Sequence, residues 1–412
     1  MIKIVDRNQA MAGALVFLFP FLCLITLFGV SVSSFSFLIA ALFIARDGVS
    51  AIERNWRALR WVLAAFLFNF LFALACLWLR EGVRLGSLEK PSRMLFSFTA
   101  LMLVLVCKPD RRTLWWGVVG GALAGALLVG YQRLGLAQER PGGLINAITF
   151  GDLSLCLGLV SIAAALDLRH TRLALWPAVG LLAGLAGSIM TGTRGGWLAL
   201  VMAALVLIKY SHVLHSRRVR LLVVASFALV AATYFVPDLG VHDRVVQGVF
   251  DVTSYFGGGS AFTNVGIRLE LWKAAMLLIA EHPLLGVDFE TARATMAAWV
   301  AAGRLDPVVL PMPHMHNDAL QALVTGGVVG FSAWLSTLAA PFVFFARLLA
   351  PRAQANKPQF ALALAGMLVV AGYFSFGLTE VIFWSVKGSL FYALMIFLLM
   401  GLCLNAKETD GK

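Results

Sequence analysis

The chain has 412 residues, of which 60% are hydrophobic and 13% charged, and its formal net charge is +12. Soluble globular domains carry roughly 25% charged residues, and this apolar excess is too large for one aqueous core. The composition therefore excludes a soluble protein and indicates an integral membrane protein whose solvent is lipid.

Apolar segments near the length that a bilayer requires, roughly 20 residues, recur along the whole chain. Each is expected to form a helix, so the sequence predicts an all-α polytopic membrane protein. It forms one integral membrane domain over residues 1–412, because no linker sets off a second one. About twelve spans are predicted, at 11–29, 31–45, 61–79, 94–107, 114–131, 147–166, 173–190, 197–208, 221–236, 319–341, 360–376 and 388–404.

Basic residues are concentrated in alternate connecting segments. By the positive-inside rule these segments and both termini are expected in the cytoplasm. The start of the chain lacks a small-residue cleavage site, which predicts a retained first helix rather than a signal peptide. The positive charge then favours anionic lipid, not nucleic acid, as its partner. The basic segments are 46–60, 108–113, 167–172, 209–220 and 347–358.

The segment Thr191–Trp197 joins two predicted spans with almost no loop and contains one cation, Arg194. Gly195 and Gly196 permit positive φ and the close approach of a ligand to the backbone. A guanidinium holds phosphate oxygens bidentately, so this hairpin is a candidate phosphate clamp at headgroup depth. An arginine that only snorkels at a hairpin tip is the alternative.

The longest polar segment, 237–318, lies on the side opposite the basic segments. A helical pattern covers about 265–280, before Pro283 and Gly286, and a second amphipathic stretch covers 290–304. Helices of this kind are expected to lie along the membrane surface. The first contains Arg268, a candidate second cation for the same anionic group. A solvated arginine is the alternative, although Glu270, two residues away, would not face it on a helix.

The segment 311–321 precedes a span that is predicted to begin near Ala319. Asn317 or Asp318 is expected to cap that helix. The positive end of the helix disfavours an imidazolium, so His316 is expected to be neutral near pH 7 and able to accept a proton. A structural loop histidine is the alternative, and that is the favoured interpretation of His314.

Weaker candidates are acids and cations at membrane depth or at the outer face. Asp152 and Glu380 lie within or near the ends of spans, where acids are functional candidates or partners of a buried arginine. The pair Asp288 and Glu290 has the chemistry of a divalent-cation site, although a solvated face is favoured. Outer cations able to help hold an anionic headgroup are Arg133, Arg140 and Lys387.

Three motifs occur together in a fixed order. They are the Arg-Gly-Gly-Trp hairpin at 194–197, Arg268-x-x-x-Trp272 followed by His282-Pro283-Leu284-Leu285-Gly286, and His316-Asn317-Asp318-Ala319-Leu320-Gln321 at the start of a helix. From about Thr191 to Gly330 the chain thereby resembles the O-antigen ligase superfamily, which also contains O-antigen polymerases and bacterial O-oligosaccharyltransferases. It looks like the ligase branch, because it lacks a large C-terminal outer domain.

The resemblance implies a membrane glycosyltransferase of the C type, working at the periplasmic face of the bacterial inner membrane without a cofactor or metal. The implied donor is a glycan on undecaprenyl diphosphate, and the implied acceptor is a sugar hydroxyl of the lipid A–core oligosaccharide. The catalytic residues it implies are His316, Arg194 and Arg268. Candidate substrate-binding residues are Gly195, Gly196, His314, Asn317, Asp318, Gln321, Arg133, Arg140, Lys387 and Glu380.

The residues are compatible with this chemistry. A sugar hydroxyl needs a base in the transition state, and His316 can supply it. The two arginines can stabilise a departing diphosphate, so one direct displacement with inversion is expected. Two alternatives stay open. One is a polymerase that uses a lipid-linked glycan as the acceptor, and the other is a transporter of the lipid-linked glycan, which the lack of internal repeats disfavours.

Overall fold

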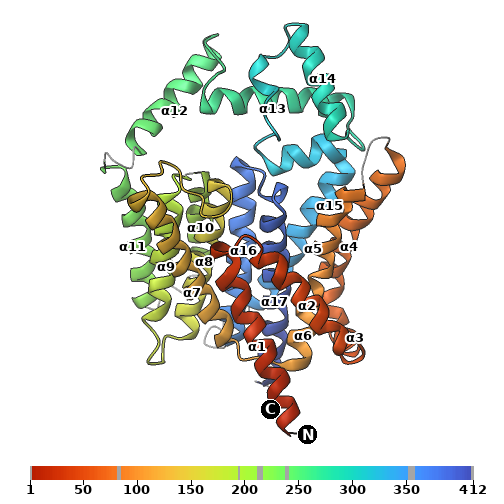
Figure 1. Ribbon diagram of the computed structural model, residues 1–412, viewed down its shortest axis with the longest axis vertical. Helices are drawn as coiled ribbons and strands as arrows, with labels where there is room; N and C mark the ends of the chain where they lie inside the picture. Colours follow the sequence, from red (N-terminus) through yellow and green to blue (C-terminus); the bar gives the residue numbers. More distant parts are fainter. Residues whose placement is uncertain are drawn as a thin grey trace.

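The computed structural model describes residues 2–80, 85–193, 195–210, 217–236, 241–350 and 358–409, and these residues contain helices and no strand. The chain is thus an all-helical polytopic membrane protein (Figure 1). Its helices are α1 (Ile2–Ile25), α2 (Gly29–Phe43), α3 (Ala45–Arg54), α4 (Trp56–Leu79), α5 (Glu89–Phe96), α6 (Phe98–Cys107), α7 (Arg112–Gly130), α8 (Ala147–Asp167), α9 (Trp176–Met190), α10 (Leu198–Lys209), α11 (Arg217–Thr233), α12 (Val241–Phe256), α13 (Asn264–Glu281), α14 (Phe289–Ala301), α15 (Asp318–Leu349), α16 (Pro358–Thr379) and α17 (Val386–Thr409).

Each of the twelve predicted spans contains a helix, but the count of twelve is not confirmed. Within the described residues, eight helices are long and apolar enough to cross a membrane, or nine if α2 and α3, bent by 93° at their junction, form one broken span. The helices α9 and α10 are apolar but shorter. The basic segment 46–60 was predicted as a connection, and it contains helix α3 instead. Apolar pattern indicates a helix, whereas crossing depends on its length and tilt.

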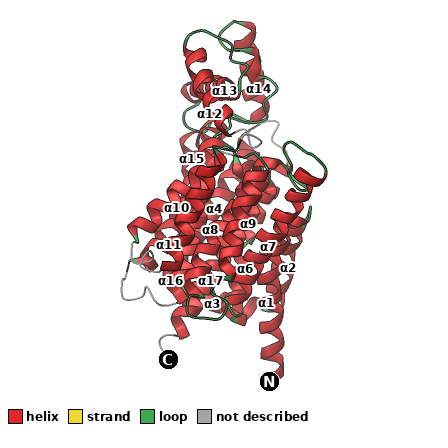
Figure 2. Cartoon of the chain, turned by 90° about the vertical axis from the view of Figure 1, so that its left-hand side faces the viewer, coloured by secondary structure: helices red, strands yellow, loops and turns green. Residues whose placement is uncertain are grey.

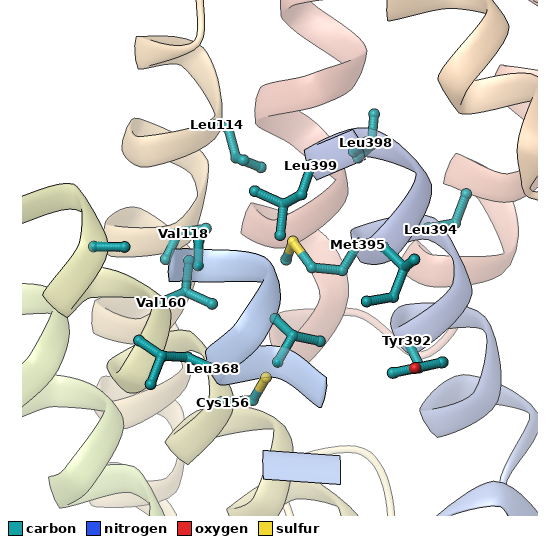
Figure 3. Close-up of a cluster of buried hydrophobic side chains, with 14 of the residues drawn as sticks. Leu114, Val118, Cys156, Val160, Leu368, Tyr392, Leu394, Met395, Leu398 and Leu399 are labelled. Carbon is teal, nitrogen blue, oxygen red and sulfur yellow. The ribbon is translucent and has the colours of Figure 1, made fainter. Parts of the chain in front are cut away.

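The helices α16 and α17 form the centre of the bundle (Figures 1 and 2). Helix α16 packs against α8, α10, α15 and α17, while α17 also packs against α5 and α6. Between these helices Leu368, Tyr392 and Met395 meet Cys156 and Val160 in a buried cluster (Figure 3). A helix that is apolar all round must be buried or face lipid. The helices α16 and α17 are largely buried, whereas α4 exposes Trp61, Trp78 and other large apolar side chains, as a lipid-facing helix does.

Helix α15 is broken at Gly327, and the segment 283–287, which follows α13, packs into the break. Gly327 has φ +56° and ψ −158°. The freed backbone groups pair with that segment: Val287 N donates to Val324 O (2.9 Å) and Val328 N donates to Pro283 O (2.8 Å). Arg80 adds guanidinium hydrogen bonds to the carbonyls of Thr325 and Leu285. Broken helices survive at membrane depth only when their backbone groups find such partners.

We expect Gly327→Ala to destabilise the protein. Its φ/ψ lie in a region essentially restricted to glycine, where strain costs of order 1–3 kcal/mol, and a Cβ would also clash with the backbone of Leu284. Gly372→Ala in α16 is the matched control, because a Cβ there meets only ordinary contacts, the nearest at 3.5 Å. Thermal unfolding in detergent should show a lower midpoint for Gly327→Ala alone. Equal midpoints for the two variants would contradict this account of the break.

The segment from α12 to α14 lies at the end of the bundle opposite the two chain ends (Figure 1). The helices α13 and α14 coincide with the patterns at 265–280 and 290–304, while α12 was not anticipated. This segment has its own buried cluster, which includes Leu271, Met296, Trp299 and Met315. Because α13 packs on α15, the segment is fixed directly above the start of that helix.

Candidate active site

The loop before α15 turns back on itself at His316. Asn317 is the N-cap of the helix, and its Oδ1 accepts a hydrogen bond from Leu320 N (3.0 Å) while its Nδ2 donates to Leu378 O (3.1 Å). His316 has φ +50°, which is uncommon for a residue other than glycine. In this conformation its backbone N–H points to the ring of His314, whose Nδ1 accepts it at 3.3 Å. The capping role expected of Asn317 is thus present.

Two braces hold Met315, in the middle of this loop. Its N–H donates to Gln321 Oε1 (3.0 Å), and its carbonyl accepts from Trp272 Nε1 (3.1 Å). Trp272 lies one turn after Arg268 on α13, so both side chains project from the same face of that helix. The motif Arg-x-x-x-Trp therefore has a structural reason. The tryptophan fixes the helix to the histidine loop, and the arginine is thereby brought to the site.

Glu380 lies where α16 ends, and its carboxylate faces both histidines. His316 Nδ1 is 3.1 Å from Oε2, and His314 Nε2 is 3.2 Å from Oε1. Val381 N also donates to Oε1 (3.0 Å). Burial alone would raise the pKa of Glu380, but hydrogen bonding and charge from His316 and charge from His314 hold it below its ordinary value. Glu380 is therefore a charged acceptor at neutral pH, and it fixes Nδ1 of His316 as a donor.

A hollow of about 320 Å³ lies beside this pair. It is formed by the hairpin after α9, the first half of α13, the histidine loop and the end of α16, so segments far apart in sequence meet here. Its titratable and cationic groups come from His316, Glu380, Arg268 and Arg140. Its lining residues are Arg140, Ile148, Gly192, Thr193, Gly195, Gly196, Asn264, Ile267, Arg268, Met312, His316, Thr379 and Glu380.

The hairpin glycines are needed for close packing rather than for positive φ. Gly195 and Gly196 are not among the residues with positive φ, which in this hairpin is adopted by Gly192 (φ +68°). A Cβ on Gly195 would press on Thr379, and one on Gly196 would clash with Asp152. The freedom for positive φ that the sequence allowed at these two glycines is not used, whereas both do line the hollow. Arg194, between Thr193 and Gly195, lies outside the described residues.

Other predicted residues lie away from the hollow. Lys387 Nζ donates to Thr26 O (2.8 Å), and Arg133 donates to the carbonyls of Glu139 and Met190. Asp288 is the N-cap of α14, with Oδ1 accepting from Thr291 N (3.0 Å), a role that was not predicted for this acid. None of these three side chains lines the hollow.

Asp318 and Gln321 face a second cavity, of about 230 Å³, on the other side of the first turn of α15. Lys90 also lines this cavity, and its Nζ donates to Phe383 O (2.7 Å). Sequence reasoning missed Lys90, since one lysine near a predicted span carries no signal of its own. It also missed Thr379, Met312 and Asn264 in the hollow, which are ordinary residue types without a motif.

The donor set of His314, His316 and Glu380 converges closely enough to be tested as a metal site, with ligand atoms all within 4.8 Å of one another. A metal on Nε2 of His314 would require the proton to sit on Nδ1. That nitrogen already accepts the N–H of His316, so the two arrangements conflict. These residues fit a hydrogen-bonded trio better than a metal centre, and metal-independent chemistry stays a prediction.

The fold and this hollow define a polytopic membrane protein with a histidine–carboxylate pair and cations near one end of its bundle. Residues 178–335 match the family model of the O-antigen ligase. The match spans the hairpin, α13 and the histidine loop, and it confirms the resemblance to that family. It supports a glycosyltransferase-like function of the ligase or polymerase type. Four residues that complete the hollow lie outside the matched segment: Arg140, Ile148, Thr379 and Glu380.

An uncharacterized protein of Haemophilus influenzae (strain ATCC 51907 / DSM 11121 / KW20 / Rd) is 24% identical over 289 residues, which cover 69% of this chain and 72% of that one. The similarity extends well beyond the segment that the family model matches. It adds no activity, because that relative is itself uncharacterized.

Proposed function

We propose that this protein transfers a glycan from undecaprenyl diphosphate to a sugar hydroxyl of the lipid A–core oligosaccharide, as an O-antigen ligase with a C-type glycosyltransferase fold. The single observation that carries the proposal is the hollow in which His316, held by Glu380, lies with Arg268 and Arg140. A base and a cationic surface are the two requirements for moving a sugar from a diphosphate to a hydroxyl.

The proton of the acceptor hydroxyl goes to His316. Glu380 accepts Nδ1–H of His316, which leaves the lone pair on Nε2 available as the base. As Nε2 takes the proton, the hydroxyl oxygen attacks the anomeric carbon from the face opposite the diphosphate. One bond forms and one breaks at that carbon, so the configuration inverts. Glu380 stabilises the imidazolium that results, as carboxylates do beside catalytic histidines.

The departing diphosphate needs a cationic environment. Arg268 and Arg140 line the hollow, and a guanidinium can bind two phosphate oxygens at once. The backbone of Gly195 and Gly196 lines the same hollow and leaves room for the diphosphate beside it. Arg194 would add a third cation from the hairpin. In this proposal the diphosphate is not bound by four other predicted residues. His314 and Asn317 hold the histidine loop, and Asp318 and Gln321 line the second cavity.

Orientation follows from charge. The basic segment that contains α3 and the two chain ends lie at the end of the bundle opposite α12–α14 (Figure 1). The positive-inside rule puts the basic end in the cytoplasm. We therefore propose that the protein resides in the bacterial inner membrane with the hollow and the segment 237–318 at the periplasmic face.

The decisive experiment mixes purified protein with lipid-linked glycan and lipid A–core, with and without a chelator. A new glycolipid in both reactions is expected, since no step above uses a metal. Replacing lipid A–core by a second lipid-linked glycan tests the polymerase, because elongated lipid-linked product would then appear. Gradient-dependent movement of the lipid-linked glycan without a new glycosidic bond would contradict the proposal and favour a transporter.

A further inference from the structure

His314 is fully engaged on both ring nitrogens, although it does not line the hollow. Its Nδ1 accepts the backbone N–H of His316 (3.3 Å), and its Nε2 lies 3.2 Å from Glu380 Oε1. The side chain is only 12% exposed. Its ring packs edge-on against Trp384, with centroids 5.7 Å apart, and against the ring of His316 at 4.5 Å. The ring therefore has one well-defined position.

These contacts fix which nitrogen of His314 carries the proton. A neutral imidazole has one N–H and one acceptor nitrogen. Because Nδ1 accepts a backbone N–H, the proton must be on Nε2, where it donates to Glu380. Burial lowers the pKa of His314, Glu380 opposes this, and the neighbouring His316 adds to it, with a net shift below the ordinary value. His314 is thus neutral at pH 7 and acts as a one-way donor.

Glu380 then receives three N–H donors, from His314, His316 and the backbone of Val381. The donors from His314 and Val381 converge on Oε1, while His316 Nδ1 bridges the two oxygens, 3.1 Å from Oε2 and 3.2 Å from Oε1. A carboxylate held in this way cannot rotate toward solvent. It presents a charged acceptor to one nitrogen of His316 only, and this keeps the other nitrogen free as the base.

The left-handed conformation of His316 connects the two histidines. Its φ of +50° turns its own N–H back toward His314. The backbone N–H of His316 thus fixes the tautomer of His314. His314 in turn holds the carboxylate of Glu380, and that carboxylate fixes the tautomer of His316, the proposed base. The spacing His-x-His is required for this closed arrangement, and a single histidine in the loop could not form it.

We propose that His314 is a positioning residue for the transfer reaction: it fixes Glu380, and through Glu380 it fixes the tautomer and orientation of His316, without touching substrate. This inference rests on the proposed function, in which His316 is the base. It assigns His314 a role other than binding of substrate.

The test compares His314→Gln with His314→Leu. The amide nitrogen of glutamine can donate to Glu380 from nearly the place of the imidazole Nε2, whereas leucine fills the space without a donor. We expect His314→Leu to lower kcat about 10- to 100-fold, by analogy with the loss when the outer partner of a metal-ligating histidine is removed, with KM nearly unchanged. His314→Gln should recover most of kcat. His242→Leu, at an exposed histidine of α12, should leave kcat at the wild-type value.

A second arm tests whether His314 acts through the carboxylate. In a Glu380→Gln background, His314→Leu should have little further effect on kcat, because residues in one chain of contacts are not additive. Three outcomes would overturn the inference. They are equal kcat for His314→Gln and His314→Leu, a change in KM alone, or a full additional loss of kcat from His314→Leu in the Glu380→Gln background. Thermal unfolding in detergent verifies that each variant is folded. Absence of transfer by wild-type protein would instead contradict the proposed function, so the two failures are distinguishable.

Discussion

His316→Ala is expected to leave a folded, membrane-inserted protein that has lost transfer to lipid A–core. General bases contribute roughly 10²–10⁴-fold to such steps, so residual transfer should lie that far below wild type. The loss should be in kcat, because the imidazole acts on the acceptor proton as the bond forms. His316 keeps the loop in a left-handed conformation, which alanine adopts less readily than glycine or asparagine.

His316→Asn therefore accompanies the alanine variant, since asparagine tolerates positive φ but cannot act as the base. Both variants should be inactive and retain the unfolding midpoint within a few degrees. His242→Ala, on exposed α12, serves as the histidine control. Near-normal transfer by His316→Asn would show that His316 is not the base, whatever the alanine variant does.

Arg268→Ala is expected to produce the second largest loss, about 10²–10³-fold in kcat, which is the usual cost of removing one group that stabilises developing charge. Arg268→Lys keeps the charge but not the planar, two-pronged geometry, and should stay well below wild type. Arg268 lines the hollow beside His316. The variant should stabilise the departing diphosphate less, but the histidine loop should stay assembled because Trp272 holds it.

Steady-state transfer with purified variants measures this prediction, and Arg293→Lys on α14 is the matched control because Arg293 is exposed on the same outer segment. The same comparison at Arg194 gives an independent test of the hairpin arginine. Wild-type activity in Arg268→Lys would mean that only the charge of that residue matters. Wild-type activity in Arg268→Ala would remove Arg268 from the site.

Local sequence was a good guide to helices and their ends. The apolar segments, the helix at 265–280 and the cap at Asn317 follow from nearest neighbours along the chain, and they are present. The number of spans was not obtained in this way. Whether α9, α10 or the bent pair α2–α3 crosses a bilayer depends on length and on the helices packed around it.

The candidate site shows the same division between what local sequence predicts and what helix packing decides. Sequence pattern pointed to His316 and Arg268, and both line one hollow. It ranked Glu380 among the weaker acids, because 64 residues separate it from His316 and no motif links them. Only the packing of the end of α16 against the histidine loop brings the carboxylate to the imidazole.

By itself, then, the sequence determined that this is an all-helical membrane protein, since composition and short motifs encode burial in lipid and local capping, and it pointed to one histidine and two arginines as candidate site residues. The tertiary structure alone decided which groups act together: Glu380 with the two histidines, Trp272 with the loop, and Pro283–Val287 with the break in α15. Those partners are distant in sequence, and their contacts are set by how the helices pack and not by any local preference of the chain.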